Sequence, residues 1–342
     1  MYLYMQNILV LGFGVASTAY VSLLDHNKKR VFVVGSPFDF KKIKSAKKLR
    51  YIKNDNIKLN FSKNIFFYNN LEDIPFFKFS LIIIGVNSNG IAWAASELKK
   101  IKINCPILIL TKGLKKEKKT ICTISDYFKS NTSFKKIISA SGPCLAGELI
   151  KKIHTRTVLA SSNINDAKIV KKILENQYYH PALTTDIKGA EICAATKNIY
   201  ATIIGAAAGQ SGLNIKKSNT VYFNAASALF EQSLKEMNII VKKFHGNTLT
   251  VMGPAGAGDL YVSALGGRNS KMGYFLGNGF LYQKIINNFM KGITVEGAEL
   301  ILDVGSQLIR ILGSKNIPLA TFLYDAVKKN KKLHINWKKF TN

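Results

Sequence analysis

The spacing of the hydrophobic positions changes near the middle of this chain. In the first half, short apolar runs rich in branched residues alternate with longer segments of helical spacing. We predict strands at residues 8–11, 31–34, 81–86, 107–110 and 137–140. Strands that alternate with helices predict a mostly parallel sheet with helices on its faces. We expect an α/β domain.

The second half has a different pattern. After residue 186, apolar residues recur at helical spacing over residues 190–209, 225–237, 296–312 and 319–329. We therefore predict an all-helical domain and place the boundary near Pro181, with residues 1–183 before it and residues 184–342 after it. Residues 41–70, which are basic and rich in asparagine, are expected to form an extended surface connection with one or two minor strands.

A glycine turn follows the first predicted strand directly. Gly12 and Gly14 lie in it, Val15 and Ala16 open the next predicted helix, and Ser17 stands where a third glycine is usual. Gly12 permits a tight turn and Gly14 allows backbone N–H groups to approach a pyrophosphate at the N-terminus of the helix. A small Ser17 still permits close packing of this helix. The first domain is therefore expected to be a Rossmann-type domain that binds a dinucleotide.

The residues after the second predicted strand bear on the choice of cofactor. A carboxylate at this point binds the ribose hydroxyls of NAD, but here the strand is followed by Gly35 and Ser36. Three lysines come soon after: Lys41, Lys42 and Lys44. We expect Ser36 to contact the cofactor, and we expect NADP to be favoured over NAD.

The net charge of +29 raises the question of a polyanionic partner. The excess is almost entirely lysine, because the chain has only five arginines, and the lysines are dispersed without an aromatic-interleaved stripe. Lysine lacks the planar fork that suits phosphate recognition. Compositional bias is the simpler explanation, so we expect no nucleic-acid partner.

Other features bear on the location of the protein. The first residues lack the pattern of a signal peptide, and the weakly polar stretch 190–209 contains Lys197 and Asn198 near its middle. The four cysteines lack the spacing of metal ligands, and we expect them to be free thiols in a reducing compartment. We expect a cytoplasmic protein without stable membrane insertion and without a metal site.

Lys197 is the main chemical candidate. It lies in a predicted helix with Ala194 and Ala201 on roughly the same face, where a buried ammonium is costly unless it has a function. Desolvation and a nearby cation such as Lys112 would lower the pKa of its amine. An amine of that kind can deliver and recover a proton, but a lysine whose amine reaches solvent at the margin of the helix is the alternative. The neighbouring motifs at residues 111–113 and 258–260 favour the first, so Lys197 is our candidate general acid/base.

Several short clusters carry a resemblance that covers nearly the whole chain. They are residues 111–113, 141–148, 196–198, 258–260 and 266–269. Their order and spacing resemble the bacterial type of the NAD(P)-dependent glycerol-3-phosphate dehydrogenase family. The resemblance implies a fold like that of 6-phosphogluconate dehydrogenase, a homodimer, and reduction of dihydroxyacetone phosphate to glycerol 3-phosphate for phospholipid synthesis.

The resemblance also implies roles for individual residues. Asp259 matches the carboxylate that partners the catalytic lysine, and Arg268 with Asn269 matches the phosphate binders, so the catalytic residues expected are Lys197, Lys112 and Asp259. Residues expected at the substrate are Lys112, Gly142, Cys144, Lys197, Asn198, Asp259, Ser263, Gly267, Arg268 and Asn269. Residues expected at the cofactor are Gly12, Gly14, Val15, Ala16, Ser36, Lys112, Ala146, Arg268 and Glu296.

Some positions depart from the family pattern and keep two alternatives open. Cys144 stands where the bacterial family prefers Ser or Thr, and Asn87 stands where Pro is usual. A thiol is a poor hydrogen-bond donor, so weaker substrate contact or altered specificity is one expectation. The alternatives are a related two-domain reductase of another small keto acid, such as ketopantoate, and a dinucleotide-binding protein that has lost turnover.

Overall fold

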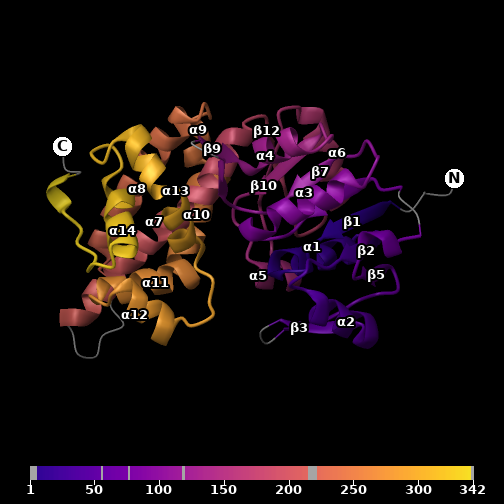
Figure 1. Cartoon of the computed structure of the whole chain (residues 1–342), viewed down its shortest axis with the longest axis horizontal. Coiled ribbons are helices and arrows are strands. Elements are labelled where there is room, and N and C mark those ends of the chain that lie inside the picture. Colours follow the sequence, from indigo (N-terminus) through magenta and orange to yellow (C-terminus); the bar gives the residue numbers. More distant parts are fainter. Residues whose placement is uncertain (1–5, 55–56, 76–77, 118–119, 215–221, 340–342) are drawn as a thin grey trace. The chain divides into compact units, whose positions relative to one another are not determined.

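The computed structural model describes residues 6–54, 57–75, 78–117, 120–214 and 222–339. They form two compact units (Figure 1). The first comprises the described parts of residues 1–112 and 124–187, and the second comprises those of residues 113–123 and 188–342. The predicted boundary at 183/184 stays a prediction. Each unit is described by itself below.

The first unit is built on an eight-stranded sheet in the order β12-β11-β10-β7-β6-β1-β2-β5. Neighbouring strands are parallel except for the pair β10 and β11. The strands are β1 Asn7–Leu11, β2 Arg30–Val34, β5 Ile65–Tyr68, β6 Leu81–Ile84, β7 Ile107–Ile109, β10 Ile137–Ser141, β11 Val158–Ala160 and β12 Ala182–Thr184. The predicted parallel sheet and its five predicted strands are confirmed.

The central strands are buried on both faces. Every residue of β6 is fully buried, as are residues 8–11 of β1, which explains their unbroken apolar runs. The described part of this unit includes the helices α1 Val15–His26, α3 Ile91–Lys99, α4 Ile124–Asn131, α5 Ala146–Ile150 and α6 Ile164–Leu174. Short turns of 3-10 helix lie at Leu71–Asp73 and Ser88–Gly90. Because β1 ends at Leu11 and α1 begins at Val15, the first turn of α1 lies at the carboxyl edge of the sheet.

The prediction for residues 41–70 was right about two minor strands, but it missed a helix and a strand of the main sheet. This region forms the helix α2 Phe40–Leu49 and the hairpin of β3 Tyr51–Asn54 and β4 Ile57–Asn60, and then enters the main sheet as β5 beside β2. In α2 only Ile43 and Ala46 are buried, and the other positions are mostly exposed. Two buried apolar residues among lysines give a weak helical pattern, which is why the sequence analysis missed the helix.

The second unit is helical apart from one hairpin. Its helices are α7 Ile187–Asn214, α8 Phe223–Lys243, α9 Leu249–Met252, α10 Asp259–Leu265, α11 Arg268–Gly277, α12 Tyr282–Lys284, α13 Glu296–Leu312 and α14 Pro318–Lys328. Shorter helical turns lie at Pro254–Gly258, Ile285–Phe289 and Trp337–Lys339. The four predicted helical segments are confirmed. The hairpin of β8 Leu114–Glu117 and β9 Thr120–Thr123 contacts α13 and was not predicted.

Helix α7 lies among the other helices of this unit (Figure 1). Its residues around position 200 are fully buried. No helix in the described part of the chain is long and apolar enough to cross a membrane. Helix α11 crosses α7 at backbone contact. A Cβ on Gly273 would lie 1.9 Å from the carbonyl oxygen of Thr202, and one on Gly209 would lie 2.0 Å from that of Tyr274. Only glycine permits this approach.

A buried carboxylate joins three helices of the second unit. Glu236 in α8 is fully buried, and its side chain accepts hydrogen bonds from the backbone N–H groups of Leu319 (2.7 Å) and Ala320 (3.1 Å) at the N-terminus of α14. The hydroxyl of Tyr200 in α7 also donates to it, at 3.1 Å. Burial raises the pKa of Glu236 from 4.5 to about 7, and these hydrogen bonds oppose the rise.

This raised pKa predicts a pH-dependent stability. Between pH 4.5 and about 7 the unfolded chain ionises at this carboxyl while the folded protein keeps the proton, so the unfolded state binds fewer protons. The contribution of Glu236 to the free energy of unfolding therefore falls as the pH rises. Glu236→Gln removes the titration. The difference in free energy of unfolding between parent and variant should fall by about 2 kcal/mol from about pH 5 to about pH 8.

Urea unfolding across this pH range measures the difference. The matched control is Glu231→Gln, which neutralises a carboxylate of the same helix whose side chain is exposed and pairs with Lys235. An unchanged difference between the parent and Glu236→Gln across the range would show that Glu236 does not titrate there.

Candidate functional site

The glycine turn lies at the carboxyl end of β1. Gly12 has a φ of +90°, and its N–H donates to the carbonyl oxygen of Val34 at 2.8 Å, which ties the turn to β2. A Cβ on Gly14 would meet no protein atom closer than 3.6 Å. Helix α1 begins at Val15, which is 55% exposed, and no side chain caps its N-terminus. The first-turn N–H groups thus suit a phosphate of a dinucleotide.

Ser17 keeps the close packing that a third glycine would provide. It is fully buried, and its hydroxyl donates to the carbonyl oxygen of Gly85 at 2.7 Å, directly after β6. Gly85 in turn has no room for a Cβ, which would lie 2.0 Å from Ser17 Oγ. The side chain of Asn87 accepts a hydrogen bond from the N–H of Gly90 at 3.1 Å and caps the turn before α3. Both departures from the family pattern have a local structural role.

A carboxylate that the sequence analysis missed lies beside the glycine turn. Asp39 Oδ2 accepts hydrogen bonds from the N–H of Phe13 (2.9 Å) and from the N–H (3.0 Å) and hydroxyl (2.5 Å) of Ser36. No carboxylate directly follows β2, but the expectation of NADP that was drawn from this did not take Asp39 into account. Asp39 lies five positions beyond the strand, and only the fold of the segment between them brings it back to the turn.

Lys42 also lies at this turn. Its amine donates to the carbonyl oxygen of Phe13 at 2.7 Å and to Thr18 Oγ1 at 3.1 Å. The same amine lies 4.6 Å from the centroid of the Phe13 ring. Burial lowers the pKa of Lys42, and the charge of Asp39 opposes this. Of the three lysines expected near a phosphate, this one is bound within the protein.

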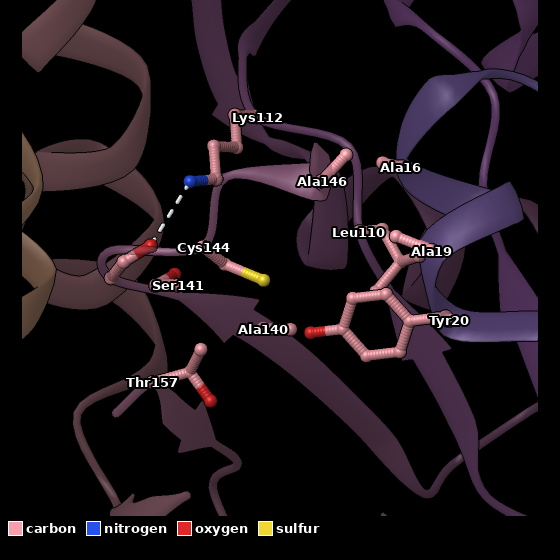
Figure 2. A pocket seen from close by; sticks show the side chains of 11 residues that line it. Ala16, Ala19, Tyr20, Leu110, Lys112, Ala140, Ser141, Cys144, Ala146 and Thr157 are labelled. Atoms are coloured by element: carbon pink, nitrogen blue, oxygen red, sulfur yellow. Dashed lines mark hydrogen bonds between the residues drawn. The ribbon is translucent and has the colours of Figure 1, made fainter. Parts of the chain in front are cut away.

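A pocket of about 40 Å³ in the first unit brings together several predicted residues (Figure 2). The predicted residues that line it are Ala16, Lys112, Gly142, Cys144 and Ala146, and the others are Ala19, Tyr20, Leu110, Ala140, Ser141 and Thr157. The amine of Lys112 donates to the carbonyl oxygen of Gly142 at 3.2 Å. The loop after β7 and the loop after β10 therefore meet near the start of α1.

Tyr20, which the sequence analysis did not single out, lines one wall of this pocket, and its hydroxyl contacts that of Tyr179. The hydroxyls of Tyr20 and Tyr179 lie 2.7 Å apart, and Thr157 Oγ1 donates to the Tyr179 hydroxyl at 2.8 Å. Burial, more than the neighbouring Tyr179 and Cys144, raises the pKa of Tyr20. The sulfur of Cys144 faces the pocket interior with the Tyr20 hydroxyl beyond it (Figure 2). This wall is neutral at ordinary pH.

The second unit contains the candidate acid/base. Lys197 in α7 donates to Asp259 Oδ1 at 2.6 Å and to Ser263 Oγ at 2.7 Å. Lys197 is 7% exposed and Asp259 is 2% exposed. Asp259 and Ser263 lie four residues apart in α10, so they share one face of that helix. The structure thus brings together three predicted residues around one buried amine.

Asn269 connects the starts of two helices to α7. Its Nδ2 donates to Asn198 Oδ1 at 2.9 Å, and its Oδ1 accepts from the N–H of Gly297 at 2.9 Å. Its amide group is therefore bonded within the unit at both ends, so its side chain fixes α11 and α13 against α7. Any contact of this side chain with a phosphate stays a prediction.

Arg268 begins α11 and remains accessible. Its side chain is 53% exposed, and one of its guanidinium N–H groups donates to Glu296 at the start of α13. Gly267 before it has a φ of +93°, and a Cβ there would meet no atom within 4 Å. No side chain caps the N-terminus of α11. A guanidinium beside open backbone N–H groups suits an anion such as a phosphate.

Two family models match the two halves of the chain. The one described as the N-terminus of NAD-dependent glycerol-3-phosphate dehydrogenase matches residues 7–167, and the one described as its C-terminus matches residues 186–337. A relative from Clostridium botulinum, named glycerol-3-phosphate dehydrogenase [NAD(P)+], is 30% identical over 84% of this chain and 82% of its own length.

A second relative, from Archaeoglobus fulgidus, is named NADP(+)-dependent glycerol-3-phosphate dehydrogenase. It is 28% identical over 79% of each chain. Among solved structures, glycerol-3-phosphate dehydrogenase from Coxiella burnetii is similar in fold, with a TM-score of 0.80 at 24% identity over 96% of each chain.

The buried pair of Lys197 and Asp259 predicts a coupled effect on stability. Asp259→Ala removes the carboxylate that accepts a hydrogen bond from the buried Lys197 amine, while the Ser263 hydroxyl still accepts one. The free energy of unfolding should fall by about 3 kcal/mol. Adding Lys197→Met should restore much of this loss, because the uncompensated charge is gone. Urea unfolding of the parent, both single variants and the double variant measures the coupling, and simply additive losses would contradict it.

Proposed function

Because the chain belongs to the NAD-dependent glycerol-3-phosphate dehydrogenase family, we propose that it reduces dihydroxyacetone phosphate to sn-glycerol 3-phosphate. It is an NAD(P)-dependent oxidoreductase, and use of NAD or NADP is confirmed. The alternative of a ketopantoate-like reductase is not favoured, because both family models belong to the glycerol-3-phosphate enzymes. The alternative of a dinucleotide-binding protein that has lost turnover gives the buried amine of Lys197 no function.

The observation that supports this reaction best is the environment of the Lys197 amine. Asp259 and Ser263 each accept one of its hydrogen bonds, so the amine is oriented and its charge is balanced. A bound nicotinamide supplies the hydride to the substrate carbon. Lys197 donates a proton to the carbonyl oxygen, and Asp259 stabilises the ammonium before that transfer. In the oxidative direction the neutral amine recovers the proton.

The first unit supplies the residues that we assign to the cofactor. Gly12, Gly14 and the first turn of α1, with Val15 and Ala16, hold the pyrophosphate, and the pocket with Ala146 lies beside that turn. Its lining also contains Lys112 and Cys144, which we assign to the substrate end. The raised pKa of Tyr20 keeps its phenol neutral, so this wall can offer a hydrogen bond but adds no charge. Residues 1–183 form the cofactor domain in this proposal.

The second unit supplies the residues that we assign to the substrate phosphate. Arg268 provides a charged fork, and the backbone N–H groups after Gly267 provide neutral donors. The pairing of Arg268 with Glu296 holds the guanidinium at the start of α11. Glu296 and Arg268 also stay our proposed contacts to the cofactor. Residues 184–342 form the catalytic domain in this proposal.

The setting of the enzyme follows from its product. Glycerol 3-phosphate is the backbone of glycerophospholipids, so we assign the enzyme to phospholipid synthesis in the cytoplasm. We also propose a homodimer. The resemblance to the family supports the homodimer.

Substitution of Arg268 tests the phosphate assignment. Arg268→Lys keeps the charge but loses the planar fork, and kcat/KM for dihydroxyacetone phosphate should fall by about tenfold. Arg268→Ala should lower it by about a hundredfold. The assay is oxidation of NADH and of NADPH, with ketopantoate and buffer in parallel. The parent should turn over only the phosphorylated substrate.

The matched control is Arg310→Ala, which removes an exposed arginine from α13. It should leave kcat/KM unchanged. An unchanged kcat/KM in Arg268→Ala would make Arg268 a surface residue and leave the phosphate without a site. Turnover of ketopantoate by the parent would overturn the proposed reaction.

A further inference from the structure

Asp39 does not act as an ordinary helix cap. It is the N-cap residue of α2, a position where aspartate usually accepts a hydrogen bond from the first turn of its own helix. Here its side chain makes no cap hydrogen bond. Its Oδ2 instead accepts from Phe13 and Ser36, and Phe13 lies between the two glycines of the turn. The carboxylate is therefore held at the glycine turn.

One oxygen of this carboxylate is available to a ligand. All three described hydrogen bonds of the side chain go to Oδ2, and among the described residues none goes to Oδ1. Asp39 is only partly buried. A carboxylate in this position carries a fixed negative charge that a bound molecule must either hydrogen-bond or avoid.

The cation that interacts electrostatically with Asp39 is Lys42, and it offsets part of this negative charge. The amine of Lys42 is engaged by the Phe13 carbonyl oxygen and by Thr18 Oγ1. Lys41 and Lys44 of α2 have exposed side chains. Exposed lysines contribute little to the binding of an anion such as a 2′-phosphate, compared with the fixed charge of Asp39 at the glycine turn.

We propose that Asp39 selects NAD over NADP by accepting a hydrogen bond from a ribose hydroxyl of the adenosine at Oδ1 and by repelling a 2′-phosphate. In sheets of this kind the adenosine ribose lies between the glycine turn and the end of the second strand, which are the two places that Asp39 joins. The inference rests on the proposed function, and it reverses the preference expected from the sequence.

Binding titrations test the inference without relying on turnover. Isothermal titration calorimetry gives the Kd of NADH and of NADPH for the parent and for Asp39→Asn. An asparagine at this position still has an oxygen that can accept from the Phe13 N–H, so the turn is retained while the charge is removed. The parent should bind NADH more tightly. In Asp39→Asn the ratio of the two Kd values should shift toward NADPH by about tenfold or more.

The control is Asp73→Asn, which removes one exposed negative charge from the same unit. It should leave the ratio unchanged, whereas an equal shift in this variant would indicate a general effect of net charge and overturn the inference. Tighter NADPH binding by the parent would also overturn it. Parallel weakening of both cofactors in Asp39→Asn would make Asp39 only a support for the turn. If the parent bound neither cofactor, the proposed function would fail as well.

Discussion

A buried ammonium is the constraint around which the second unit is organised. Lys197 lies in the middle of a helix whose neighbouring residues are almost fully buried, where an unpaired charge would be strongly destabilising. The carboxylate of Asp259 balances that charge at 2.6 Å, and the hydroxyl of Ser263 accepts a second hydrogen bond. Such a pair contributes little net stability compared with apolar residues. Its presence in the core is therefore better explained by chemistry than by folding.

The packing around α7 keeps this amine in place. Helices α11 and α7 approach at backbone contact through glycines such as Gly273, and the amide of Asn269 connects the starts of α11 and α13 to Asn198, the residue after Lys197. One helical turn beyond Lys197, the hydroxyl of Tyr200 donates to Glu236, which also caps α14. Rigid elements on several sides thus fix the position of a single proton donor.

The sequence predicted the parts of the structure whose pattern is local. The sheet strands were found because residues such as those of β6 are buried on both faces and apolar throughout. Helix α2 was missed because lysines surround its two buried residues, Ile43 and Ala46. The clusters around Lys197, Asp259 and Arg268 were found by resemblance. Asp39 and the Tyr20–Tyr179 pair depend on contacts between distant segments, for which the sequence has no periodic signal.

The account depends most directly on the role of Lys197 as the proton donor. The deciding measurement is kcat for dihydroxyacetone phosphate in Lys197→Ala, together with the Kd of NADH. The variant should lose at least about a hundredfold in kcat while it binds NADH as the parent does, because the glycine turn belongs to the other unit. A kcat close to that of the parent would contradict the account.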